Sequence, residues 1–304
     1  MDSFPRVIFM GSPDFAVPSL RSLHGSMGVQ AVVTQPDRPA GRGRALSPPP
    51  VKVEALSLGI PVIQPEKLSH PDAVGQLRSW SPDVIVVVAF GQILKPEVLD
   101  LPKYGCLNVH GSLLPRWRGA APIQAAILAG DTRSGITIMK MDPGVDTGPI
   151  LRQRPIPISP DDTGGSLFSK LASLGAELLI ETLPDYLAGK ILPQAQDERL
   201  ASYAPLLKKG DGLLDFHRPV EELLRVVRAF NPWPGAYLLW EGQSLKIHRA
   251  RPGSRQGTPG ERLVLAGMPA LAAADGVLIL EEVQPAGKKP MLGSSFLAGA
   301  RNWV

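Results

Sequence analysis

One apolar run limits the possible folds of this chain more than any other feature. Residues 83–90 read Asp-Val-Ile-Val-Val-Val-Ala-Phe, with no polar residue after the first. A strand with one face in water alternates apolar and polar residues, whereas a continuous run is typical of a strand covered on both faces. The run therefore predicts a central strand of a parallel sheet that lies between two layers of helices.

Shorter segments before this run predict the same architecture. The predicted strands are residues 6–11, 29–34 and 61–63. The predicted helices that separate them are residues 17–23, 50–58 and 72–79. Alternating strands and helices predict an α/β fold with a doubly wound, Rossmann-like, mostly parallel sheet. Ligands of such sheets bind beyond the carboxyl ends of the strands, so functional residues are expected there.

The sequence pattern changes after a long predicted helix at residues 163–189. Residues 190–210 have weak periodicity and many polar side chains, as a linker does. Beyond them an amphipathic helix is predicted at residues 220–230, and residues 270–274 are predicted to be a small Ala-rich loop. Short strand candidates follow the helix, at residues 236–240, 244–250, 262–266 and 277–283. Strands at this spacing indicate a small β-barrel.

These patterns divide the chain into predicted domains. We expect an α/β domain over residues 1–189, a linker over residues 190–210 and a β-barrel domain over residues 211–304. The barrel resembles an oligonucleotide-binding fold and is therefore expected to be an OB-like, tRNA-binding domain. An OB-like domain is the antiparallel type of barrel that binds oligonucleotides.

Composition excludes several classes of protein. The chain has 304 residues and one cysteine, Cys106, so a disulfide framework and a multi-cysteine metal site are excluded and a cytoplasmic location is expected. Cys106 is predicted to be a buried structural thiol. No apolar run approaches the roughly 20 residues that span a bilayer, so no membrane partner is expected. The net charge of +4 permits an anionic partner without requiring one. We expect a monomer without a bound metal.

Three polar residues suggest acyl transfer to an amine, which requires stabilisation of a negative carbonyl oxygen and movement of protons. Asn108 can donate an amide N–H to such an oxygen, and His110 can donate a hydrogen bond or carry a proton near neutral pH. The two residues face the same side of a predicted strand because they are two positions apart. Asp146, on a Gly-rich loop, could fold back and orient the His110 ring.

Each of these side chains also has an ordinary structural explanation. A single histidine at a strand end is most often a structural hydrogen-bonding residue, and an aspartate in a Gly-rich turn is usually a turn residue. The dinucleotide motif G-x-G-x-x-G, the phosphate loop G-x-x-x-x-G-K-[ST] and the nucleophile motif G-x-S-x-G are all absent. Spacing alone therefore leaves the function open.

The wider pattern resembles the folate-dependent formyltransferases. The matching motifs are Asn108-Val109-His110, Ser112-Leu113-Leu114-Pro115 and Asp146-Thr147-Gly148. The resemblance implies that Asn108, His110 and Asp146 carry catalysis, and that 10-formyltetrahydrofolate is the formyl donor. The residues implied to bind the donor are Ser112, Leu113, Leu114 and Pro115, together with Phe90, Gln92 and Leu94 after the apolar run.

Nearly the whole chain resembles those members of the family that formylate methionyl-initiator tRNA. The further matching segments are residues 7–13, 34–43, 117–122 and 231–236. The resemblance implies that a loop with Arg38, Arg42 and Arg44 meets the acceptor stem, with Arg42 in contact, and that Lys208 and Lys209 lie along the tRNA. Arginine can bind a phosphate through two parallel N–H groups. Considered in isolation, however, this loop is more simply interpreted as a solvated basic loop.

Two alternatives remain at this point. An amino-sugar or nucleotide formyltransferase would explain Asn108, His110 and Asp146 but not the arginine loop. A non-catalytic RNA-binding protein with a relic folate pocket would explain the basic segments but not the intact catalytic set. The sequence thus favours transfer of a formyl group from 10-formyltetrahydrofolate to the free amino group of methionyl-initiator tRNA, a step of translation initiation.

Overall fold

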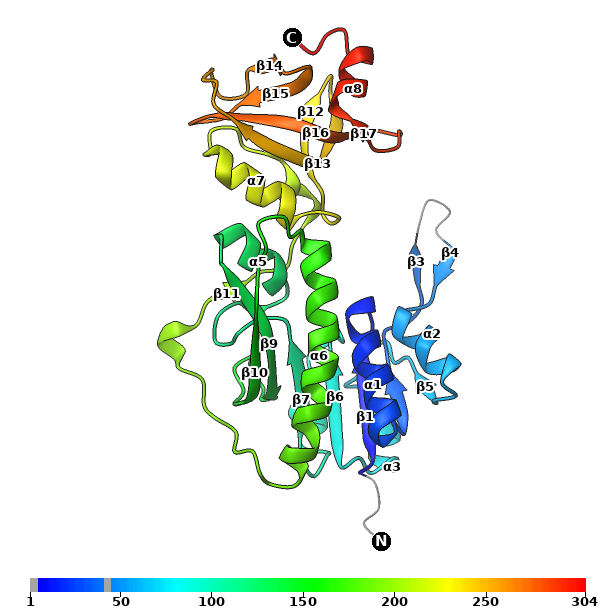
Figure 1. Cartoon of the computed structure of the whole chain (residues 1–304). Coiled ribbons are helices and arrows are strands. Elements are labelled where there is room, and N and C mark those ends of the chain that lie inside the picture. The colour runs from blue at the N-terminus through cyan, green and yellow to red at the C-terminus, as the bar shows by residue number, and fades with distance from the viewer. Residues whose placement is uncertain (1–4, 41–44) are drawn as a thin grey trace. The chain divides into compact units, whose positions relative to one another are not determined.

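The computed structural model describes residues 5–40 and 45–304 (Figure 1). These residues form two compact units. The first consists of residues up to 119, 134–156 and 168–203, and the second of residues 120–133, 157–167 and 204–304. Each unit is assembled from segments that are not contiguous in the sequence. The contiguous domains at residues 1–189 and 211–304 stay a prediction.

A seven-stranded sheet forms the centre of the first unit, with the strand order β10-β9-β7-β6-β1-β2-β5. Its strands are β1 (Val7–Gly11), β2 (Ala31–Val33), β5 (Val62–Ile63), β6 (Val84–Val88), β7 (Cys106–His110), β9 (Arg133–Lys140) and β10 (Ile150–Pro157). The neighbouring strands β5, β2, β1, β6 and β7 run parallel to one another, and β9 is antiparallel to β7. The predicted mostly parallel sheet is confirmed.

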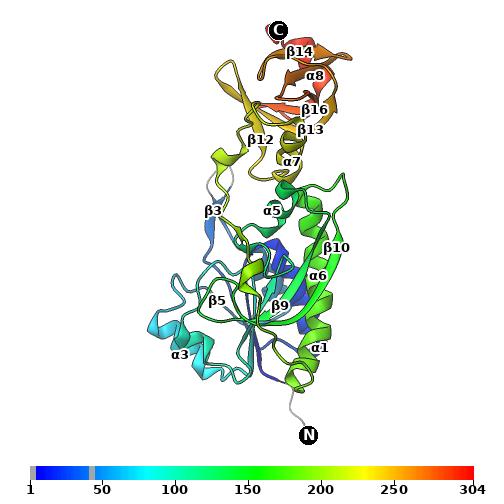
Figure 2. The ribbon, with the colours of Figure 1, turned by 90° about the vertical axis from the view of Figure 1, so that its left-hand side faces the viewer.

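The apolar run becomes the central strand of this sheet. Every side chain of β6 is buried, and β6 pairs with β1 on one side and β7 on the other. Helices cover both faces, with α1 (Val17–Met27) and α6 (Gly164–Leu187) on one face and α3 (Pro71–Ser79) on the other (Figure 2). A strand covered on both faces has no polar face, and this explains the absence of alternation in its sequence.

The remaining elements of this part of the chain are short. They are η1 (Asp14–Ala16), β3 (Arg38–Ala40), β4 (Ala45–Ser47), α2 (Pro50–Ser57), α4 (Pro96–Leu99), β8 (Arg118–Gly119), η2 (Glu198–Leu200) and β11 (Tyr203–Ala204). In the described part of the chain, no helix has the length and apolar character that crossing a bilayer requires.

The second unit contains an antiparallel sheet with the path β12-β13-β16-β15-β14, and β17 pairs with β16. Its strands are β12 (Ala236–Trp240), β13 (Gln243–Gly253), β14 (Arg262–Leu265), β15 (Met268–Ala272), β16 (Val277–Pro285) and β17 (Met291–Leu292). Its helices are α5 (Pro122–Ala129), η3 (Lys209–Gly212), α7 (Val220–Ala229) and α8 (Gly293–Gly299). In α7 the buried Val220, Leu223 and Val227 follow the predicted helical periodicity.

The prediction of an Ala-rich loop at residues 270–274 is wrong over most of its length, because β15 extends to Ala272. Ala270 and Ala272 are fully buried, and β15 pairs with both β14 and β16. Alanine is rare in strands as an isolated preference, but its small side chain fits a densely packed sheet interior.

Cys106 is buried in β7, as predicted for a structural thiol. Its Sγ donates to the carbonyl oxygen of Val98 at 3.8 Å. Burial raises the pKa of the Cys106 thiol to about 12, so the thiol stays protonated and unreactive at neutral pH.

Candidate active site

Asn108, His110 and Asp146 meet at the carboxyl end of β7. Asn108 and His110 lie on this strand, and Asp146 lies in the loop between β9 and β10. The Asn108 amide Nδ2 donates to Asp146 Oδ1 at 3.2 Å. The other carboxylate oxygen, Asp146 Oδ2, lies 3.5 Å from His110 Nδ1. One carboxylate therefore faces both side chains that β7 presents on the same side.

The His110 ring is held by its other nitrogen. Its Nε2 lies 2.9 Å from the carbonyl oxygen of Trp117, and the side chain is only 6% exposed. A carbonyl oxygen accepts hydrogen bonds and cannot donate them, so Nε2 carries a hydrogen. Nδ1, which faces Asp146, is therefore the nitrogen that can gain or lose a proton.

Asp146 has a backbone conformation that is unusual for a residue with a side chain. Its φ is +54°, in the left-handed region that favours glycine. The backbone N–H of Gly119 donates to Asp146 Oδ2 at 2.8 Å and fixes the carboxylate. Sequence reasoning missed this contact, and the Trp117 carbonyl, because a backbone group leaves no side-chain signal in the sequence.

The predicted donor-binding segment at residues 112–115 is held mainly by hydrogen bonds within the protein. Ser112 Oγ donates to the carbonyl oxygen of Arg116 at 2.6 Å. Thr137 Oγ1 donates to the carbonyl oxygen of Ser112 and accepts from the backbone N–H of Leu114. The side chains of Ser112 and Leu114 are buried, whereas Leu113 and Pro115 are half-buried. Leu113 and Pro115 are therefore the two side chains of this segment that keep part of their surface exposed.

The predicted donor-binding residues after β6 also have structural contacts. Phe90 and Leu94 are buried in a core cluster of the first unit. Gln92 accepts from the backbone N–H of Leu68 at 2.7 Å and donates to the carbonyl oxygen of Pro65 at 3.2 Å. Its side chain therefore braces the loop that follows β5.

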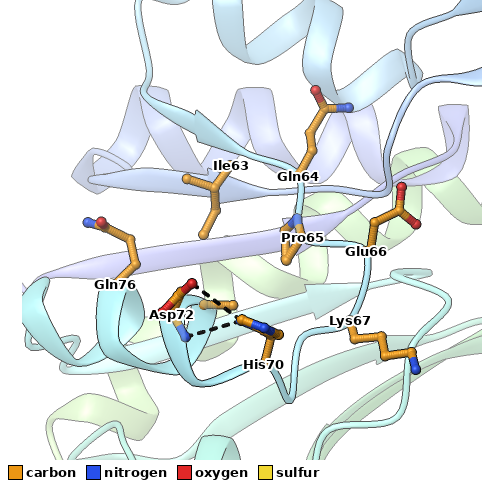
Figure 3. Close-up of a pocket in the computed structure, with 9 residues that line it drawn as sticks. Ile63, Gln64, Pro65, Glu66, Lys67, His70, Asp72 and Gln76 are labelled. Carbon is orange, nitrogen blue, oxygen red and sulfur yellow. Dashed lines mark hydrogen bonds and ion pairs between the residues drawn. The ribbon is translucent and has the colours of Figure 1, made fainter.

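A cavity of about 480 Å³ lies beside this braced loop and not at the three polar residues. Its lining comes from the end of β5, the following loop and the first turns of α3 (Figure 3): Ile63, Gln64, Pro65, Glu66, Lys67, His70, Asp72, Ala73 and Gln76. Asn108, His110 and Asp146 are not among its lining residues. The sheet order separates β5 from β7 by three strands, so this cavity is distinct from the catalytic candidate.

The predicted tRNA-binding residues are not all within the described chain. Arg42 and Arg44 lie outside the described residues. Arg38, on β3, is 66% exposed and lies 3.9 Å from a Glu66 carboxylate oxygen. Lys208 and Lys209 are exposed in the second unit.

Comparisons with known proteins agree with the fold. A family model described as formyl transferase matches residues 6–183, and one described as formyl transferase, C-terminal domain, matches residues 206–301. A methionyl-tRNA formyltransferase from Myxococcus xanthus is 50% identical over 300 residues, which cover 98% of this chain and 96% of that protein. A methionyl-tRNA formyltransferase from Geotalea uraniireducens is 50% identical over 97% of this chain and 95% of its own length.

Solved structures share the fold at lower identity. WlaRD, a sugar 3N-formyl transferase, aligns with a TM-score of 0.67 at 19% identity, over 94% of this chain and 99% of that chain. HypX from Aquifex aeolicus, solved with tetrahydrofolic acid, aligns with a TM-score of 0.65 at 19% identity, over 99% of this chain and 48% of that chain. The two family models and the full-length relatives show that this chain belongs to the formyl transferase family, among the methionyl-tRNA formyltransferases.

Proposed function

We propose that this protein transfers a formyl group from 10-formyltetrahydrofolate to the free amino group of methionyl-initiator tRNA and so makes N-formylmethionyl-tRNA for translation initiation. The observation that carries the proposal is the Asp146 carboxylate, which faces both Asn108 and His110, in a chain whose full-length relatives are methionyl-tRNA formyltransferases. We further propose that the protein works in the cytoplasm as a monomer.

Asn108 is suited to stabilise the formyl oxygen as it becomes negative. An asparagine amide has two N–H donors, and the amide of Asn108 gives one of them to Asp146 Oδ1. That bond fixes the amide plane and leaves the second N–H for the substrate oxygen. A fixed donor needs no reorientation during the reaction, and this is the main advantage of such sites.

Asp146 and His110 are suited to move the proton that the amine loses. The neutral amine attacks the formyl carbon, the bond from this carbon to N10 of the donor breaks, and N10 takes up a proton as tetrahydrofolate leaves. Asp146 Oδ2 and His110 Nδ1 face one another, so a proton accepted by the carboxylate can pass to the ring. His110 Nε2 is committed to the Trp117 carbonyl, so a protonated His110 acts on the developing negative charge through its own charge.

The residues around the three catalytic candidates fit a folate. A pterin ring has apolar faces and polar edges. Ile93, in the loop after β6, is 78% exposed, and Val145, next to Asp146, is 58% exposed. Both are large apolar side chains on loops that border the carboxyl end of β7, and they would cover a ring face that approaches Asn108 and Asp146.

A formylation assay tests the proposed function. The purified protein is given methionyl-initiator tRNA with 10-formyltetrahydrofolate, and the aminoacyl product is analysed after hydrolysis. We expect formylmethionine with the folate and none without it. Formylation of a nucleotide-linked amino sugar but not of the tRNA would show that the amino sugar is the substrate. Binding of tRNA without any formyl transfer would show that the protein is not a formyltransferase.

Loss of Lys208 and Lys209 is expected to weaken the use of tRNA without slowing the chemistry. In the double variant Lys208→Ala/Lys209→Ala, KM for tRNA should rise about tenfold and kcat should stay within about twofold, because phosphate contacts add affinity only. The slope of log KM against the logarithm of the salt concentration should fall by about two, one for each lysine removed. Lys190→Ala is the control, since the exposed Lys190 pairs with Asp185 on α6. An unchanged salt dependence would contradict the tRNA contact.

Arg42→Ala is expected to impair the use of tRNA without affecting the binding of the folate. By resemblance the loop with Arg38, Arg42 and Arg44 meets the acceptor stem, next to the attacking amine. We expect kcat/KM for tRNA to fall about tenfold or more, by loss of a forked phosphate contact, while KM for the folate is unchanged. A rate whose dependence on tRNA concentration matches the unmodified protein would exclude this role.

A further inference from the structure

Arg118 lies between the two backbone groups that hold the catalytic side chains. The preceding residue, Trp117, presents the carbonyl oxygen that contacts His110 Nε2 at 2.9 Å. The following residue, Gly119, donates its N–H to Asp146 Oδ2 at 2.8 Å. The placement of residue 118 therefore sets the distance between the anchor of the histidine and the anchor of the carboxylate.

The Arg118 side chain is completely buried, which arginine tolerates only when its donors are paired. Nη1 and Nη2 each donate to a carboxylate oxygen of Glu198 at 2.8 Å. Nε and Nη2 also donate to Gln196 Oε1, at 3.1 and 2.9 Å. Both partners come from the segment that the sequence presents as a linker.

Gln196 connects this arginine to the catalytic loop. Its Oε1 accepts from Arg118, and its Nε2 donates to the carbonyl oxygens of Asp146 at 2.8 Å and Gly148 at 2.7 Å. The amide orientation is unambiguous, because arginine only donates and a carbonyl oxygen only accepts. Glu198, Arg118, Gln196 and the Asp146 backbone thus form one continuous hydrogen-bonded chain.

Ser202, from the same segment, holds the backbone on the other side of this chain. Its carbonyl oxygen accepts from the Arg118 N–H at 2.8 Å, and its Oγ accepts from the Trp117 N–H at 3.0 Å. Residues 196–202 are therefore fixed to both anchors of the catalytic site.

We propose that Gln196 and Arg118 are positioning residues, which hold Asp146 in its left-handed conformation so that its carboxylate reaches Asn108 and His110. A residue with a side chain keeps such a conformation only where its surroundings determine it, and Gln196 grips the Asp146 carbonyl group directly. The inference rests on the proposed function, and it makes the segment at residues 196–202 part of the catalytic machinery.

The variant Gln196→Glu tests this role with little change in shape. One carboxylate oxygen keeps the contact with Arg118, and the other replaces the donor to Asp146 and Gly148. We expect kcat to fall about 10- to 100-fold, as a small misplacement of a catalytic group does. KM for tRNA and for the folate should stay within about twofold, because Asp146 acts on the reaction and not on binding.

Two comparisons separate positioning from general damage. Gln194→Glu is the matched control: it makes the same change at an exposed side chain two residues earlier, where the contacts with Ile150 are made by the backbone, so we expect the unmodified rate. In a protein that already carries Asp146→Asn, adding Gln196→Glu should lower kcat by less than about threefold. A residue that acts only by positioning the Asp146 carboxylate has little further effect once that carboxylate is gone. Full additivity of the two losses would overturn the proposal.

A second variant protects the test against misfolding. Glu198 is 68% exposed, so Glu198→Ala should fold, remove one support of Arg118 and lower kcat about three- to tenfold with unchanged KM values. If the unmodified protein formylates tRNA and both Gln196→Glu and Glu198→Ala keep its kcat, the positioning role is overturned but the proposed function stands. Absence of formylation by the unmodified protein would overturn the proposed function itself.

Discussion

Replacement of Asp146 by asparagine is expected to lower kcat by about a thousandfold or more while the protein stays folded and binds tRNA normally. Asparagine has nearly the same shape, so the Gly119 N–H can keep an acceptor. Its amide cannot, however, accept from Asn108 with one atom and act on His110 Nδ1 with the other, because one of its two terminal atoms is a donor. Proton transfer through the pair is lost as well.

Single-turnover formylation with saturating tRNA and folate measures this loss directly. KM for tRNA should stay within about twofold, because the carboxylate acts on the reacting centre. Asp185→Asn is a suitable control, since Asp185 lies on α6 and pairs with Arg152 and Lys190. A rate within tenfold of the unmodified protein would remove Asp146 from the proton-transfer step.

His110→Ala is expected to be the second most damaging change, with a loss of about a hundredfold to ten-thousandfold in kcat. The substitution removes the ring nitrogen that faces Asp146 and the hydrogen bond from Nε2 to the Trp117 carbonyl, which keeps a longer one from Ser112 Oγ at 3.4 Å. The net contribution of one hydrogen bond to stability is about 0.5–1.5 kcal/mol, so a modest fall in Tm is expected as well.

The measurement for His110→Ala combines turnover, tRNA affinity and thermal unfolding. tRNA affinity should be nearly unchanged, because no phosphate contact is assigned to His110. An intact fold with lost turnover would place His110 in the reaction. Normal turnover would instead reduce it to the structural histidine that its position at a strand end also permits.

The segment after α6 has two proposed roles, because it contributes to the hydrogen-bonded chain that holds Asp146 and also carries the lysines proposed to bind tRNA. Gln196 and Glu198 contact residues of the site, and Lys208 and Lys209 follow about ten residues later in the sequence. The residues proposed to hold the catalytic carboxylate and those proposed to hold the tRNA therefore follow one another in the sequence. The Gln196 and Lys208/Lys209 variants separate the two roles, since the first is expected to change kcat and the second KM.

Local periodicity predicted most of the first unit. The apolar run at residues 83–90 became the buried strand β6, and the helix expected at residues 163–189 became α6 at Gly164–Leu187. Periodicity succeeds here because burial on one or both faces leaves a direct trace in the order of the residues. It failed at β15, where burial depends on neighbouring strands that accept small alanine side chains.

The candidate site divides in the same way. The sequence by itself determined that Asn108 and His110 share one face of a strand, because strand geometry repeats every two residues. Only the tertiary structure decided what holds them: Gln196 reaches Asp146 across 50 residues and Arg118 across 78. Nothing in the local order of residues encodes such contacts, because they depend on the path of the whole chain. A buried arginine paired with a glutamine and a glutamate becomes recognisable only once the chain has folded.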